Sequence, residues 1–132
     1  MKFIPIICRV LLGLMFVIFG ANAIHAFLPM PPAPPADSYV GHFMAATGPS
    51  GFMKVIGVFQ VLGGILLLIG GTVPLGLVIL CPILVNILLF HLLLAGGQGI
   101  APGGFATLLA ILLIYFYRTS FSGILNMKAT PA

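Results

Sequence analysis

The chain has 132 residues, of which 61% are hydrophobic and only 5% charged, and its mean hydropathy is +1.31. A water-soluble domain needs roughly a quarter of its residues charged to cover its surface, so this composition excludes a soluble protein and indicates a lipid-embedded one. The net charge of +4 comes from scattered Lys and Arg residues, which do not form the basic patch that nucleic acid requires. Asp37 is the single acidic residue, which excludes mechanisms built on paired carboxylates.

Four apolar segments are predicted to cross the membrane as helices, forming one all-α domain over residues 1–132. The segment 74–95 is apolar apart from Cys81, Asn86 and His91. As a helix it covers ~30 Å, which matches the hydrocarbon core of a bilayer. The predicted spans are residues 4–28, 52–71, 74–95 and 103–117.

The first predicted outer loop, residues 29–51, begins with the proline-rich stretch PMPPAPPA, which cannot be helical. Asp37 and Ser38 then offer capping oxygens to a short apolar segment from Tyr39 to Ala46. We expect this segment to be a helix that lies flat on the membrane surface. A second outer loop is predicted at residues 96–102, and residues 118–132 form a tail.

The basic residues predict the orientation of the bundle. Lys2, Arg9, Arg118 and Lys128 flank the spans on one side and only Lys54 on the other, so the positive-inside rule places both termini in the cytoplasm. Arg9 lies about two turns inside the first span. It can reach back to the lipid headgroups or be held inside the bundle by carbonyls at a helix end.

Small residues recur on one face of each of three spans and predict close contacts between helices. Gly57, Gly64 and Gly71 repeat every seven residues along the second span. The complete set of predicted packing residues is Gly13, Gly20, Gly57, Gly64, Gly71, Ala106 and Ala110.

Five polar residues lie in the spans toward the outer side of the membrane, and polar groups at such depth are candidates for function. They are Asn22, His25, Gln60, Asn86 and His91. Gln60 lies near the glycine face and is expected to bond to a neighbouring helix, as is Asn86. Asn86 and His91 are ~140° apart on an ideal helix, which predicts that they face different neighbours.

His91 has several possible roles. It can be an interfacial or hydrogen-bonded histidine, a hydrogen-bond partner of a quinone or similar redox head group, or an axial ligand of a haem or chlorophyll-type ring. A metal site from His25, His42 and His91 lacks any supporting spacing, and we predict no metal. No cofactor is assigned from the sequence alone.

Cys8 and Cys81 are predicted to lie near the same membrane face. They can form a thiol pair or serve as small packing residues, because a thiolate is disfavoured in hydrocarbon.

A set of residues in a fixed order extends over nearly the whole chain. It comprises Arg9, Gly13, Leu14, Phe16, Phe19 and Gly20, then Thr47 and Gly48, Gln60, Gly63 and Gly64, Pro74 and Leu75, Pro82, Asn86, Phe90, His91 and Leu92, and finally Tyr117, Arg118 and Phe121. This order resembles the DoxX and DoxX-like family of small bacterial membrane proteins. The resemblance implies a four-helix membrane bundle with a link to redox chemistry, since some relatives form part of a thiosulfate:quinone oxidoreductase and others belong to oxidative-stress complexes.

The sequence therefore predicts a four-span protein of the bacterial inner membrane. Its expected role is that of a non-catalytic accessory subunit of a larger, redox-linked membrane complex, with lipid and other membrane subunits as partners. One alternative is a quinone-interacting oxidoreductase subunit that uses His91 and Asn86. The other is a small transporter, for which the residues offer little support.

Overall fold

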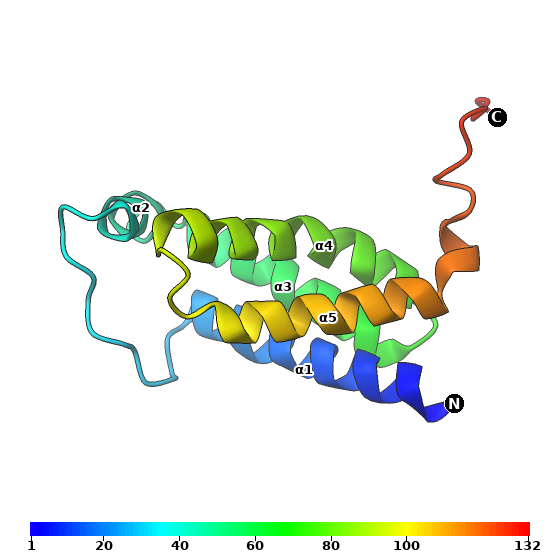
Figure 1. The fold of residues 1–132 in the computed structure, drawn as a ribbon, viewed down its shortest axis with the longest axis horizontal. Helices are drawn as coiled ribbons and strands as arrows, with labels where there is room; N and C mark the ends of the chain where they lie inside the picture. Colours follow the sequence, from blue (N-terminus) through cyan, green and yellow to red (C-terminus); the bar gives the residue numbers. More distant parts are fainter.

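The computed structural model describes residues 1–132 as an all-helical fold without β-strands. Four helices lie side by side, each antiparallel to the helix before it in the bundle (Figure 1). They are α1 (Phe3–Ile24), α3 (Phe52–Ile69), α4 (Val73–Leu89) and α5 (Ile100–Phe116). The short helix α2 (Tyr39–Thr47) crosses one end of the bundle, and both termini lie at the opposite end (Figure 1). A π-helix, η1 (Phe90–Leu94), continues α4, and a 3-10 helix, η2 (Arg118–Phe121), follows α5.

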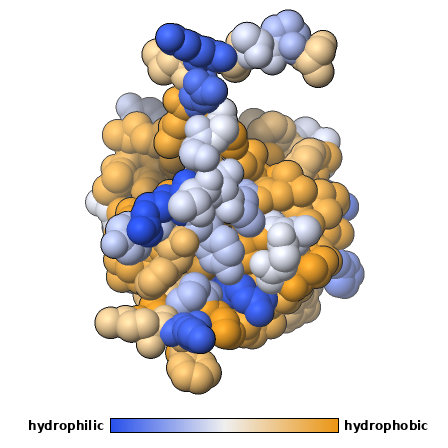
Figure 2. Space-filling view, turned by 90° about the vertical axis from the view of Figure 1, so that its right-hand side faces the viewer, coloured by the Kyte–Doolittle hydropathy of each residue, from blue (hydrophilic) through white to orange (hydrophobic).

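Three helical segments are long and apolar enough to cross a membrane. They are Phe3–Ile24, Phe52–Ile69 and Val73–Leu94, the last of which combines α4 and η1. Helix α5 is also apolar, but with 17 residues it is shorter. Seen from the end where the termini lie, hydrophilic residues gather on that end and hydrophobic residues surround them (Figure 2). The protein is thus an all-helical membrane protein, in agreement with its composition.

The helix ends differ from the predicted spans by a few residues, and hydrogen bonds explain the differences. Helix α1 ends at Ile24 because the side-chain oxygen of Asn22 accepts the backbone N–H groups of Phe27 and Leu28, each at 2.9 Å, which turns the chain out of the helix. The predicted short helix is confirmed as α2. The hydroxyl of Ser38 caps it by accepting the N–H of Gly41 at 3.0 Å.

Helices α1 and α3 touch backbone to backbone through two pairs of glycines. A Cβ atom added to Gly13 would lie 2.9 Å from the carbonyl oxygen of Gly64, and one added to Gly20 would lie 2.7 Å from that of Gly57. In the other direction, a Cβ atom added to Gly64 would lie 2.7 Å from the carbonyl oxygen of Gly13, and one added to Gly57 would lie 2.6 Å from that of Gly20. Real Cβ atoms do not approach a backbone oxygen this closely, so only glycine permits this helix separation.

Gly71 does not belong to this contact, although it continues the seven-residue spacing of Gly57 and Gly64. Helix α3 ends at Ile69, and a Cβ atom at Gly71 would meet nothing within 4 Å, because the residue lies in the turn before α4. Gly63 instead forms the contact with α4, where a Cβ atom at Gly76 would lie 2.9 Å from its carbonyl oxygen. On α5, Ala106 and Ala110 are buried in the core.

Arg9 holds the end of α3, which decides between its two predicted roles. Its Nη1 atom donates hydrogen bonds to the carbonyl oxygens of Leu67 at 3.1 Å and Leu68 at 2.7 Å. The last carbonyls of a helix have no hydrogen-bond partner within the helix and carry partial negative charge. A guanidinium group supplies both the missing donors and a compensating positive charge. Gly70 makes room for it, since a Cβ atom there would lie 3.0 Å from the guanidinium carbon.

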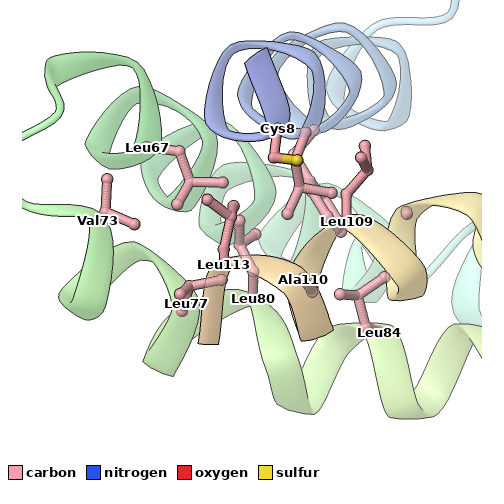
Figure 3. Close-up of a cluster of buried hydrophobic side chains, with 12 residues drawn as sticks. Cys8, Leu67, Val73, Leu77, Leu80, Leu84, Leu109, Ala110 and Leu113 are labelled. Atoms are coloured by element: carbon pink, nitrogen blue, oxygen red, sulfur yellow. The ribbon is translucent and has the colours of Figure 1, made fainter. Parts of the chain in front are cut away.

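The hydrophobic core consists of 12 buried side chains from the four long helices (Figure 3). By their positions along the helices, most of them lie in the half of the bundle nearer the termini. Cys8 belongs to this core and Cys81 packs against it, and both thiols are free. From α3, the core includes only Leu67, in the last turn of the helix. The half of the bundle near α2 is therefore packed less completely.

The glycine contact predicts that Gly20→Ala lowers the free energy of unfolding by about 1–3 kcal/mol, because the added methyl group forces α1 away from α3. Gly104→Ala is the control, since a Cβ atom at Gly104 meets nothing within 4 Å. Thermal unfolding in detergent, followed by circular dichroism, measures both variants. Equal melting temperatures for the two would contradict the role of the contact.

Candidate functional site

Two clefts open in the half of the bundle near α2. The first, which we call the α2 groove, has a volume of about 610 Å³ and lies between α2, α3, α4 and η1. It is lined by Phe43, Met44, Phe52, Met53, Ile56, Gln60, Ile83, Asn86, Ile87, Leu89, Phe90, His91, Leu93 and Leu94. Its volume falls within the range of ~300–1,000 Å³ that is usual for small-molecule sites.

The second cleft, the α1–α5 cleft, has a volume of about 330 Å³. It is lined by Met15, Phe16, Phe19, Gln60, Leu84, Ile87, His91, Gly99, Pro102, Gly103 and Ala106. Gln60, Ile87 and His91 line both clefts, so the clefts meet at these three residues. Two of the three carry polar side chains in otherwise apolar surroundings.

Gln60 is the only buried polar side chain, with 8% of its surface exposed. The sequence predicts a hydrogen bond from Gln60 to a neighbouring helix, but its amide bonds to no other protein group. The structure contains no fully enclosed side-chain nitrogen or oxygen atom that lacks a hydrogen-bond partner. The atoms of the unbonded Gln60 amide therefore keep some accessible surface. The side chain reaches the two clefts instead. An amide that bonds to no protein group can bond to a molecule that occupies one of the clefts.

His91 is fixed in orientation by the loop that follows η1. Its Nδ1 atom lies 2.8 Å from the carbonyl oxygen of Gln98, and its backbone oxygen accepts the N–H of Gly97 at 2.6 Å. The ring also packs edge-on against Phe90, with 5.1 Å between centroids, and rests on Gly99, where a Cβ atom would lie 3.3 Å from it. These contacts hold the imidazole in one position.

Asn86 and His91 both line the α2 groove, whereas His91 alone also lines the α1–α5 cleft. The ~140° estimate assumes an ideal α-helix throughout. At η1 the N–H of Ala95 bonds to the carbonyl of Phe90, five residues earlier, at 3.0 Å. The wider turn therefore lies within Phe90–Ala95, at and after His91. Single π-turns of this kind are frequent at functional sites.

The sequence predicts that Asn86 bonds to a neighbouring helix, but it bonds to its own helix. Its side-chain N–H donates to the carbonyl oxygen of Pro82 at 2.9 Å. The amide has a second N–H and an oxygen, and the side chain is exposed along the α2 groove. Asn86 can therefore contribute a further hydrogen bond to a molecule in the groove.

Asn22 and His25 are not part of this site. Asn22 stabilises the turn after α1, and His25 is an exposed residue at the end of that helix. His42 is likewise exposed, on α2. No group of three or more His, Cys, Asp or Glu side chains is placed to hold a metal ion.

Sequence reasoning missed the role of α2 in the site. Phe43 and Met44 line the groove, and the Phe43 ring packs against that of Phe90 with 5.1 Å between centroids. The apolar spacing in the short helix was a visible signal for a buried face. It did not indicate which part of the bundle that face would cover.

No family model, curated protein or solved structure matches this chain. The function is therefore inferred from the geometry of the clefts.

The unpartnered amide predicts that Gln60→Met raises the free energy of unfolding by about 1–3 kcal/mol in the absence of ligand, since an apolar side chain of similar length removes the desolvation penalty. Thr107→Val is the matched control. Its hydroxyl already bonds to the carbonyl of Gly103 in its own helix, at 2.7 Å. Melting temperatures in detergent measure both variants, and a less stable Gln60→Met protein would show that the amide serves the fold.

Proposed function

We propose that this chain is a DoxX-like protein of the bacterial inner membrane, in which α5 is the fourth span and both termini are cytoplasmic. It is a small, non-catalytic subunit of a larger, redox-linked membrane complex. Its contribution to that complex is to hold a quinone-type molecule by its head group, where the α2 groove meets the α1–α5 cleft.

The observation that carries this proposal is the unpartnered amide of Gln60, which is nine-tenths buried where the two clefts meet. In a bilayer no bulk water is present to bond such a group, so a bound molecule is its natural partner. Natural proteins retain such costly groups at sites where binding recovers the lost hydrogen bonds.

The lining of the α2 groove supports a quinone-type ligand. Of its 14 lining residues 11 are hydrophobic, and these suit an apolar ring and tail. Gln60 and Asn86 have amide N–H groups that can donate to the carbonyl oxygens of a quinone. The groove adjoins α2, at the end of the bundle, so a ligand can enter it from the surrounding lipid.

The holding role follows from the chemistry of the lining side chains. They donate and accept hydrogen bonds and provide apolar contact, but none is a thiol, a hydroxyl nucleophile or a carboxylate. Cys8 belongs to the core and Cys81 packs against it, and neither is among the residues that line the groove. We therefore assign the redox step to a partner subunit.

Decylbenzoquinone is expected to bind the purified protein in detergent, and Gln60→Met to weaken this binding about tenfold through loss of a buried hydrogen bond. Thr107→Val, which lies outside both clefts, should bind as the wild type does. Equilibrium dialysis measures the three affinities. Absence of binding to the wild-type protein would refute the ligand-holding role.

The proposed orientation predicts that Ala33→Cys and Gln98→Cys react with a membrane-impermeant maleimide added to intact cells. Thr130→Cys, at the other end of the bundle, should react only after the membrane is permeabilised. Labelling is read by gel shift, with the wild-type protein as the control for Cys8 and Cys81. Reaction of Thr130→Cys in intact cells would reverse the orientation.

A further inference from the structure

We infer that the site prefers a head group that carries a hydroxyl, such as a hydroquinone or a phenol, over the matching quinone or ether. The inference rests on the proposed function, because it names which chemical form of the ligand the groove selects. It follows from the direction of the hydrogen bonds that His91 and Gln60 can make.

The loop determines which nitrogen of His91 carries the proton. A carbonyl oxygen can only accept a hydrogen bond, so the contact of 2.8 Å between Nδ1 and the Gln98 oxygen requires the proton to be on Nδ1. In the neutral imidazole, Nε2 is then an acceptor. No protein group donates to it. A ligand can satisfy Nε2 only by donating a hydrogen bond, which a hydroxyl can do and a ketone or ether cannot.

Gln60 provides the second polar side chain that lines both clefts. Its amide has donors and an acceptor, none of them bonded within the protein, and it lines both clefts together with His91. A hydroxyl that donates to Nε2 of His91 still has lone pairs that can accept from the Gln60 N–H. A quinone carbonyl satisfies only the second of these interactions.

The lining also requires the head group to be uncharged. No Lys, Arg, Asp or Glu side chain is among the residues of either cleft. An ionised carboxylate, phosphate or amine would be left without a counter-charge in a site of low dielectric constant, which is costly. Fatty acids and phospholipid headgroups are therefore poor ligands, and neutral phenolic compounds fit better.

Two matched ligand pairs test this inference on the purified full-length protein in detergent. The first is decylhydroquinone and decylbenzoquinone under anaerobic conditions, and the second is 4-decylphenol and 4-decylanisole, which differ in the donor but have no redox chemistry. The hydroxyl member of each pair should bind about tenfold more tightly, since it makes one more buried hydrogen bond.

His91→Asn provides the specific variant. Its amide N–H can replace Nδ1 in the bond to Gln98, but it has no atom in the position of Nε2. The hydroxyl preference should disappear, so that the two affinities within each ligand pair become close to equal whatever the effect on the absolute affinities. His91→Phe, which keeps a ring but no nitrogen, also loses the bond to Gln98 and should melt at a lower temperature. It should show the same loss of preference and covers the case in which His91→Asn does not fold.

The outcomes separate the two proposals. If the wild-type protein binds both members of each pair equally, the inference is wrong and the ligand-holding role remains. If it binds none of the four compounds, both proposals fail. If the preference persists in both His91 variants, the acceptor is not His91 and the inference is wrong as stated.

Discussion

The close contact between α1 and α3 is the constraint on which the rest of this structure depends. Two glycines on each helix let the backbones touch, and a single added methyl group at any of them would meet a carbonyl oxygen at less than 3 Å. In lipid, helices gain little from the hydrophobic effect when they associate, so dispersion contacts at short range supply much of the stability. The contact also brings Arg9 to the end of α3, where its guanidinium satisfies two helix-end carbonyls.

This contact explains why the site lies where it does. Gln60 is placed between Gly57 and Gly64 in sequence, and its Cβ atom would lie 2.8 Å from a Cβ atom at Gly20, so the helix contact buries it. Helix α4 meets α3 closely through Gly63 and Gly76, nearer the termini. Toward α2 the core is incomplete, and the two clefts occupy that space. The half near α2 thus combines a tight α1–α3 contact, at Gly20 and Gly57, with the two clefts.

The segment that follows α4 fixes the position of His91 in the site. His91 lies in η1, and the backbone oxygen of Gln98 in the glycine-rich loop contacts its Nδ1 atom. Gly97 and Gly99 have positive φ angles of 88° and 70°, which a residue with a side chain rarely adopts. The loop can therefore fold back over the ring. Helix α2 covers the same region through Phe43, so three separate parts of the chain define one small volume.

The amino-acid sequence alone predicts the membrane class, the helix positions to within a few residues and all four glycines of the α1–α3 contact. Composition and spacing carry this information because lipid permits only helices here and because close contacts need small residues. The bonds of each polar side chain depend on the tertiary structure. Arg9 meets carbonyls at the end of α3, the buried amide of Gln60 meets no hydrogen-bonding group, and Asn86 bonds to its own helix. The α2 groove depends in the same way on where α2 packs, because Phe43 and Met44 of that helix form part of its lining and the sequence does not indicate which part of the bundle they cover.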